Sequence, residues 1–282
     1  MNFFFATDLH GKSGRYEKLF RLIEEKKPAA LFLGGDLLPH AYSASIAVED
    51  FTRDYLARNF SLLRDTLKEQ YPDIFLILGN DDPRVNEESF KEIEKEQALW
   101  YYMHHRKLSR QGYDIYAYAM IPPTPFRLKD WEKYDISRYV DPGCIPPTEG
   151  FRSKPAAKNL EWSSIKKDLA KLTQNEDVSK SIFLFHTPPY KSKLDRAALD
   201  GQMIDHVPLD VHVGSIAVKE FILERKPRIS LHGHIHESTR ITGEWKEKIG
   251  ETWSFNAATD SPDLSVIVFD PEKPEEAERW LL

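Results

Sequence analysis

Leu231-His232-Gly233-His234-Ile235-His236 is the stretch from which the rest of the chain can be interpreted, and it continues the short apolar run 228–231. In an extended segment, side chains two residues apart point to the same face. We therefore expect His234 and His236 to face one point, with Gly233 letting the backbone approach whatever lies there. Two neutral imidazoles form half of a divalent metal site, although a strand end with exposed histidines explains the same pattern.

The composition is that of a globular protein with a substantial core. The chain has 282 residues, of which 41% are hydrophobic and 30% charged, and its formal net charge is -6. This charge argues against nucleic acid as an obligatory partner without excluding a local basic patch. The single cysteine, Cys144, rules out an internal disulfide and fits a reducing compartment.

The chain shows no targeting or membrane segment in its sequence pattern. The apolar start 3–5 lacks the basic flank of a signal peptide. No apolar run approaches the ~20 residues that a membrane helix needs. We therefore expect a cytoplasmic protein that does not bind membranes.

Apolar segments that resemble buried strands recur along the chain, and each is followed by residues of metal-ligand type. These segments and the residues after them are 2–6 with Asp8 and His10, 29–33 with Asp36, 73–78 with Asn80, and 181–185 with His186. In layered α/β folds, ligands bind at the carboxyl edge of the strands. Each residue alone has another explanation, such as helix capping by Asp8 or turn formation at Asn80.

Together with His234 and His236, these residues form a mixed oxygen and nitrogen ligand set without thiolate. The absence of thiolate disfavours a structural zinc site of the cysteine type. The set is too large for one ion and suits two ions that share a bridging carboxylate. We expect Asp36 to be that bridge.

The remaining elements are predicted from hydrophobic periodicity and turn signals. His104 and His105 fall inside the first of two paired strands, where we expect them to be ordinary strand residues. The predicted helices are 14–26, 45–69, 87–97, 162–172 and 215–225, and the further strands are 100–107, 113–120, 239–242, 252–256 and 265–269.

The proline-rich segment 121–159 interrupts this alternation of strands and helices. Irregular segments of this length are usually functional, so we expect a loop or lid near the active site within a single domain, 1–282. Its Arg127 and Arg152 are candidate substrate contacts. Ser215 either caps its helix or helps to form an anion site there, and His232 is either a further site residue or a buried structural histidine.

The order Asp8-x-His10, Gly35-Asp36, Gly79-Asn80, His186 and Gly233-His234-x-His236 resembles the calcineurin-like metallophosphoesterase superfamily over residues 8–236. The resemblance implies an α/β fold with a two-sheet β-sandwich core flanked by helices on both sides, in four αββα layers. It also implies two divalent metal ions, with Mn²⁺ expected first and Fe or Zn²⁺ as alternatives. Asp8, His10 and His236 would hold one ion, Asn80, His186 and His234 the other, with Asp36 between them.

The expected activity is hydrolysis of a phosphomonoester or phosphodiester of a small molecule or nucleotide. Two cations about 3.5–4 Å apart can lower the pKa of a shared water, so that the hydroxide between them attacks phosphorus. The same ions neutralise charge on the phosphoryl oxygens. A metal-binding scaffold with weak or no catalysis and a nuclease are the alternatives.

Asn80, which is also a predicted metal ligand, and Asp81 are the candidate catalytic residues, and Asp81 departs from the family pattern. Relatives usually carry a histidine at that position, which assists the leaving group. An ionised aspartate is a poor acid at neutral pH. Three alternatives follow: Asp81 orients a water or another group, a histidine elsewhere such as His40, His206 or His212 donates the proton, or the substrates need good leaving groups. The third would reflect the ~10²–10⁴ in rate that losing a general acid costs.

Overall fold

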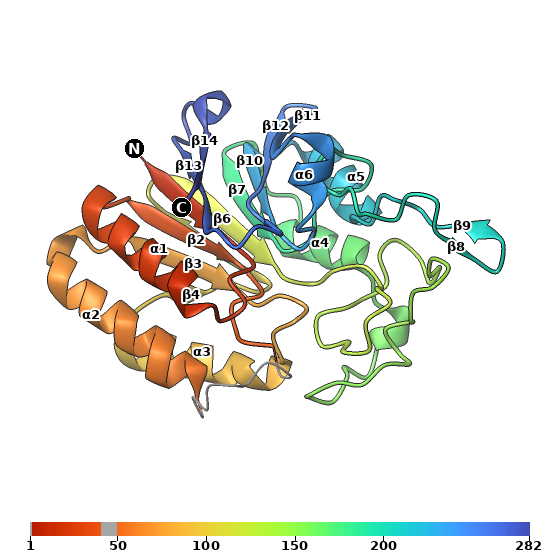
Figure 1. Ribbon diagram of the computed structural model, residues 1–282, viewed down its shortest axis with the longest axis horizontal. Helices are drawn as coiled ribbons and strands as arrows, with labels where there is room; N and C mark the ends of the chain where they lie inside the picture. The colour runs from red at the N-terminus through yellow and green to blue at the C-terminus, as the bar shows by residue number, and fades with distance from the viewer. Residues whose placement is uncertain (1, 41–49) are drawn as a thin grey trace.

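The computed structural model describes residues 2–40 and 50–282, and its strands form two six-stranded sheets (Figure 1). The first sheet has the order β14 (Glu278–Leu281), β13 (Ser265–Phe269), β1 (Phe3–Ala6), β2 (Ala30–Gly34), β3 (Asp73–Ile77) and β4 (Tyr101–Tyr102). The second has the order β11 (Lys246–Ile249), β12 (Thr252–Asn256), β10 (Ile229–His232), β7 (Ser181–Phe185), β6 (Tyr113–Tyr118) and β5 (Arg106–Arg110).

Aromatic side chains join the two sheets face to face. The rings of Phe3 and Tyr113 lie 6.0 Å apart, and those of Phe255 and Phe269 lie 5.7 Å apart. Every residue of β1 and β7 is buried, because each strand is covered on both faces. This explains why the two strands are continuous apolar runs rather than alternating patterns.

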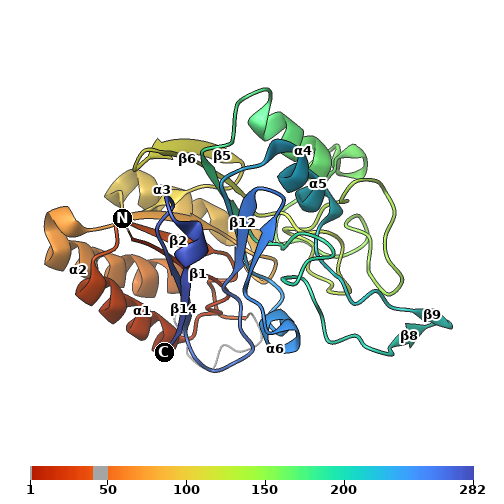
Figure 2. The ribbon, with the colours of Figure 1, turned by 90° about the horizontal axis from the view of Figure 1, so that it is seen from above.

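Helices cover the outer face of each sheet, which completes four layers (Figures 1 and 2). The first sheet carries α1 (Ser13–Lys26), α2 (Arg58–Leu67) and α3 (Glu87–Gln97), and the second carries α4 (Ile165–Thr173) and α5 (Ile216–Arg225). The ring of Phe221 in α5 lies 4.9 Å from that of Phe183 in β7, which fixes the helix on its sheet. The predicted four-layer αββα architecture is confirmed.

The strands that precede the predicted ligands are parallel neighbours. β1, β2 and β3 pair in parallel in the first sheet, as do β7 and β10 in the second. His186, just after β7, places its Nδ1 2.8 Å from the carbonyl oxygen of Gly34 at the end of β2. The carboxyl ends of both sheets therefore meet at one edge of the molecule.

Several predicted boundaries match closely, whereas two predicted strands are wrong. β7 and α3 have the predicted bounds. The segment 239–242 is part of the short helix α6 (Ser238–Thr242), which ends at Gly243 with φ 76°. The residues paired with β6 are Arg106–Arg110, so His104 and His105 lie in the turn between β4 and β5. The predicted helix 45–69 starts outside the described residues and continues as the π-helix Phe51–Ala57 before α2.

Other small elements were not predicted. They are the edge strands β11 and β14, the hairpin β8 (Met203–Ile204) with β9 (Val207–Pro208), and 3-10 turns at Lys68–Gln70, Arg84–Asn86, Leu160–Trp162 and Pro274–Glu276. No helix in the described parts of the chain is long and apolar enough to cross a membrane. The cytoplasmic location stays a prediction.

The proline-rich segment is irregular, as predicted, but it is firmly attached to the loop after β3. The Trp131 indole donates a hydrogen bond to the carbonyl oxygen of Asp82 over 2.7 Å, and Arg84 N donates to the Asp130 carboxylate over 2.8 Å. Inside the segment, Lys129 and Glu132 form a fully buried ion pair at 2.6 Å. The segment is therefore packed against the edge where the predicted ligands lie.

Replacing Phe32 with alanine tests the sandwich core. Phe32 is fully buried in β2, and its ring lies 5.1 Å from that of Phe75. Deleting a buried phenyl ring leaves a cavity and costs about 3–5 kcal/mol of unfolding free energy. Urea denaturation should show this loss for Phe32→Ala and a change within about 0.5 kcal/mol for Leu62→Ala, an exposed α2 position. Equal effects in the two variants would contradict the assigned core.

Candidate metal centre

Four predicted ligands have a left-handed backbone: Asp8 (φ 56°), His10 (φ 49°), Asp36 (φ 52°) and His234 (φ 70°). β10 ends at His232, so His234 and His236 lie in the turn that follows the strand. This turn, and not the predicted alternation of side chains along a strand, orients the two histidines. Non-glycine residues in this region cost about 1–3 kcal/mol each and persist only where the surroundings hold them. Asp8 N donates to Gly35 O over 2.9 Å and His10 N to Asp36 O over 2.8 Å, which holds the loops after β1 and β2 together.

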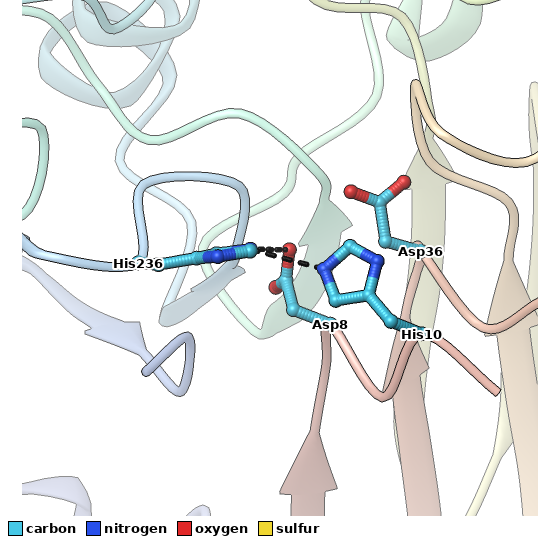
Figure 3. A group of neighbouring side chains, drawn as sticks. All are labelled: Asp8, His10, Asp36 and His236. Carbon is cyan, nitrogen blue, oxygen red and sulfur yellow. Dashed lines mark hydrogen bonds and ion pairs between the residues drawn. The ribbon is translucent and has the colours of Figure 1, made fainter. Parts of the chain in front are cut away.

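Asp8, His10, Asp36 and His236 form the first group of converging side chains (Figure 3). His236 Nε2 lies 3.0 Å from Asp8 Oδ1 and 3.2 Å from His10 Nε2. Asp8 is fully buried, and its carboxylate also accepts hydrogen bonds from Thr7 Oγ1 and His234 N. The two sheets thus contribute ligand atoms to one point.

Asp36, His186 and His234 form the second group, so Asp36 belongs to both. His186 Nε2 lies 3.3 Å from Asp36 Oδ2 and 3.0 Å from Asn80 Oδ1. Because His186 Nδ1 is hydrogen-bonded to the Gly34 carbonyl, Nδ1 carries the proton and Nε2 is the atom left to bind a metal. This is the arrangement that orients metal-binding histidines in proteins.

Opposing charges dominate the electrostatics of the two groups. Burial would raise the pKa of Asp8, but the hydrogen bond and charge of His236 hold it well below its usual range. Burial would lower the pKa of His186, but the charge of Asp36 raises it to about 10, so a bound cation would have to replace the proton on Nε2. Burial, followed by the charge of His186, lowers the pKa of His234 to about 3. Carboxylates that stay ionised beside a neutral imidazole suit a divalent cation.

Two glycines allow the loops to approach the ligands this closely. A Cβ atom at Gly79 would lie 2.2 Å from Asp36 Oδ1, and one at Gly233 would lie 2.4 Å from Asp8 Oδ2. The close approach expected at Gly233 is therefore an approach to the Asp8 carboxylate. Larger residues at either position would displace a predicted ligand.

Sequence reasoning missed Asp82, which organises the loops around Asp36 and Asn80. Its buried carboxylate accepts hydrogen bonds from Leu37 N at 3.1 Å, Leu38 N at 2.8 Å and Gly79 N at 2.9 Å. The loop after β3 is thereby attached to the loop after β2. The Asp81-Asp82-Pro83 turn was the only available signal, and it does not distinguish the two aspartates.

Asp81 lies at the mouth of the centre beside His40. Its carboxylate Oδ2 is 3.3 Å from His40 Nδ1 and 3.8 Å from His10 Nδ1, and its backbone N donates to Asp36 Oδ1 over 2.8 Å. His40 stacks on His10 with ring centres 4.5 Å apart. Burial, then the charge of Asp36, raises the pKa of Asp81 to about 7, whereas bound cations would lower it again.

The other two candidate proton donors have different surroundings. His206 is exposed in the turn between β8 and β9. His212 Nδ1 lies 2.8 Å from the buried carboxylate of Asp195. Of the three histidines, His40 is the one in contact with Asp81 and with a predicted ligand.

Three of the four predicted substrate contacts, Arg152, Ser215 and His232, form hydrogen bonds within the protein, whereas the fourth, Arg127, is exposed. Arg127 is exposed, and the Arg152 guanidinium donates to backbone carbonyl oxygens, among them Pro147 O at 3.0 Å. Ser215 Oγ caps α5 by accepting from Val218 N and donates to Asp135, whose carboxylate also accepts from Ile216 N. Of the two roles that the sequence left open for Ser215, the structure shows helix capping, and the Asp135 carboxylate occupies the helix end where an anion was considered.

His232 is a buried histidine with both ring nitrogens engaged. Nδ1 lies 2.9 Å from Thr187 O, and Nε2 lies 2.8 Å from Ser230 Oγ. Its ring stacks on Phe185 with centres 5.6 Å apart. These contacts fit the structural role that the sequence left open, and a substrate contact by His232 has no support in this geometry.

The residues of the centre fit divalent metal ions. Two imidazole Nε2 atoms, of His10 and His236, lie 3.2 Å apart beside a buried carboxylate, an arrangement that a shared cation would stabilise. His10 Nδ1 is buried and lacks a hydrogen-bond partner among the described residues. The donors are carboxylate, amide and imidazole, which are ligands for manganese, iron or zinc.

Comparisons with known proteins agree with this geometry. The family model described as calcineurin-like phosphoesterase matches residues 1–238. One crystal structure aligns with a TM-score of 0.62 and 15% identity over 99% of this chain and 98% of that chain. The crystal structure of TT1561 of Thermus thermophilus aligns with a TM-score of 0.56 and 18% identity over 99% of this chain and 98% of that chain. At these identities the structural likeness shows the fold alone.

No curated protein matches the chain significantly in sequence. The family match covers most of the chain and contains all the converging side chains described above. The chain belongs to the calcineurin-like phosphoesterase family.

Proposed function

We propose that this protein is a metal-dependent phosphoric ester hydrolase that acts on phosphomonoesters or phosphodiesters of small molecules. The observation that carries the proposal is that Asp36 belongs to both groups of converging ligand atoms, within 4.8 Å of the other members of each. Two ions that share one carboxylate are the arrangement of dinuclear hydrolytic sites. The family membership supports the same reaction class.

In this proposal, each of the two groups of converging side chains would bind one metal ion. Asp8, His10 and His236 would hold one ion, Asn80, His186 and His234 would hold the other, and Asp36 would be shared between them. Asn80 fits the second set because its Oδ1 is 3.0 Å from His186 Nε2. Bound divalent ions supply Lewis acidity and lower the pKa of a water molecule. Manganese is the ion we expect first.

Groups of the protein orient the predicted ligands and supply the negative charge that compensates bound cations. The Gly34 carbonyl fixes the tautomer of His186, and Asp82 holds the loops that carry Asp36 and Asn80. The buried positions of Asp8 and Asp36 exclude solvent and so strengthen electrostatic interactions with bound ions. In-line displacement at phosphorus needs little beyond such positioning and charge.

We also propose that His40 replaces the histidine usually found after the ligand asparagine. His40 comes from the loop after β2, but its Nδ1 lies 3.3 Å from Asp81, the residue at the usual position. Its side chain is 49% exposed, so a leaving group entering from solvent can reach it. Asp81 then orients His40, and His40 supplies the proton to the leaving oxygen.

The whole chain is proposed to act as one catalytic domain. The strands β11 to β14 follow the matched region 1–238, yet β12 pairs with β10 and β13 with β1. Removing them would expose the strands that carry Asp8 and the loop with His234. A regulatory scaffold and a nuclease are the alternatives that the assays below can detect. The Arg152 guanidinium donates to backbone carbonyl oxygens, so this basic side chain is not free to bind the phosphates of a nucleic acid.

Replacing Asp36 with asparagine tests the shared ligand. The substitution keeps the shape of the side chain and removes its charge, so both metal content and turnover should fall. Losing several kcal/mol of transition-state stabilisation lowers kcat/KM roughly 10²–10³-fold. Metal analysis and hydrolysis of p-nitrophenyl phosphate and bis-p-nitrophenyl phosphate measure the two effects.

The matched control for that experiment is Asp65→Asn, which removes an exposed aspartate from α2. It should retain both metal and activity. Full activity in Asp36→Asn would refute the bridge assignment. Metal-loaded wild-type protein that hydrolyses neither ester nor a nucleic acid would favour the scaffold alternative.

Replacing His40 with alanine tests the proton donor. A series of aryl phosphates with leaving groups of increasing pKa should show a shallow dependence of kcat/KM in the wild type and a steep one in His40→Ala. The loss should approach ~10²-fold for the poorest leaving groups and vanish for the best. His206→Ala, at the exposed hairpin turn, should keep the wild-type slope. Identical slopes in all three proteins would exclude His40 as the donor.

A further inference from the structure

A pocket of about 580 Å³ lies between the proline-rich segment and the segment 190–216. Its walls are largely apolar and aromatic. They include Ile136, Tyr139, Tyr190, Leu199, Ile204 and Leu209. Pockets of this size and lining bind organic groups in proteins.

Both walls of the pocket are attached to loops of the metal centre. Tyr190 follows His186 by four residues, a stretch that spans at most about 14 Å. Ala198 N, next to Leu199 in the wall, donates over 3.1 Å to Glu237, which directly follows His236. The pocket therefore flanks the metal centre at the same edge of the sandwich.

The opposite wall is anchored to the loop after β3. Trp131, in the same proline-rich segment as Ile136 and Tyr139, donates to the carbonyl oxygen of Asp82 over 2.7 Å. Arg84 N donates to Asp130 over 2.8 Å. These bonds connect the wall to the loop that carries Asn80.

The charges in the pocket disfavour an anionic occupant. Among the described residues that line it there is no lysine or arginine, while Asp141 and Asp210 both line it. The lining also contains His212, whose Nδ1 lies 2.8 Å from the buried carboxylate of Asp195 and is therefore already paired with an acid. The carboxylate of Asp135 is compensated by Ile216 N at 2.6 Å and Ser215 Oγ at 2.5 Å. Lys191 lies over the Tyr190 ring, 5.2 Å from its centre, but is not part of the lining.

We propose that this pocket holds the organic half of the substrate, which is an apolar, uncharged group such as an aromatic ring system. The inference rests on the proposed function and adds a substrate class to it. In the hydrolysis, the oxygen of water bonds to phosphorus, the bond from phosphorus to the alcohol oxygen breaks, and the alcohol oxygen takes up a proton. The apolar alcohol occupies the pocket before and after this step, and phosphate esters with a second anionic group are disfavoured.

Binding of 2-naphthol to the full-length protein tests the pocket apart from catalysis. Isothermal titration calorimetry should show saturable binding that is unchanged by EDTA, because the pocket is built without the metal ligands. The anionic counterpart, 6-hydroxy-2-naphthoate, should bind about tenfold more weakly, because its carboxylate meets the Asp141 and Asp210 side chains while His212 is already paired with Asp195. Equal affinity for the two compounds would overturn the proposed charge preference.

Substitutions in the walls locate the bound group. Leu209→Trp places an indole in the pocket, and Tyr139→Ala removes an aromatic wall at a position that is 69% exposed, so its folding is not at risk. Each should weaken 2-naphthol binding about tenfold. Leu223→Trp makes the same change on α5 outside the pocket, at a residue 48% exposed, and should leave the affinity unchanged. Wild-type affinity in both wall variants would place the ligand elsewhere and overturn the proposal.

Turnover separates this inference from the proposed function. The wild type should hydrolyse 2-naphthyl phosphate with a KM about tenfold below that of phenyl phosphate, and Leu209→Trp should abolish this preference. Leu223→Trp, outside the pocket, should keep both the preference and the kcat for phenyl phosphate. Binding of 2-naphthol without hydrolysis of any ester would refute the function and keep the pocket. Hydrolysis without naphthol binding or a naphthyl preference would refute the pocket and keep the function.

Discussion

The carboxylate of Asp8 is the group on which the geometry of the centre depends, because it joins the two sheets at their carboxyl edge. It follows β1 in the first sheet and receives His234 N and the His236 ring from the loop after β10 in the second. Burying a carboxylate without partners costs several kcal/mol. The loop after β10 must therefore stay in place, and the remaining ligands are held around this contact.

The sequence was sufficient to predict the sandwich core and the residues that converge on its edge. Strands such as β7 are buried on both faces, and that environment demands the continuous apolar run that the sequence shows. The predicted ligands can be recognised in the sequence because each lies within a few residues of a strand end. The polar edge strands β11 and β14 lack such a run, and Ser238–Thr242 has residues common in strands but forms a helix beside Lys193.

Other features depend on contacts between residues far apart in sequence. No local pattern predicts that Asp82 binds Leu37 and Leu38, or that His40 lies against Asp81. The left-handed conformation of Asp8, Asp36 and His234 is equally invisible, because aspartate and histidine adopt it only when neighbouring loops hold them. The local sequence therefore identified the predicted ligands, while tertiary hydrogen bonds determine how these side chains are oriented.

The contact between Asp8 and His236 spans 228 positions of the chain. During synthesis on a ribosome, β1 and β2 emerge long before the histidine loop does, and chains grow at about 5–20 residues per second. The strands β1 to β3 therefore wait for tens of seconds with their aromatic side chains uncovered by the later strands. Such a chain is prone to aggregation until its last strands arrive, so its yield in a cell should depend on chaperones that cover this half-built sandwich.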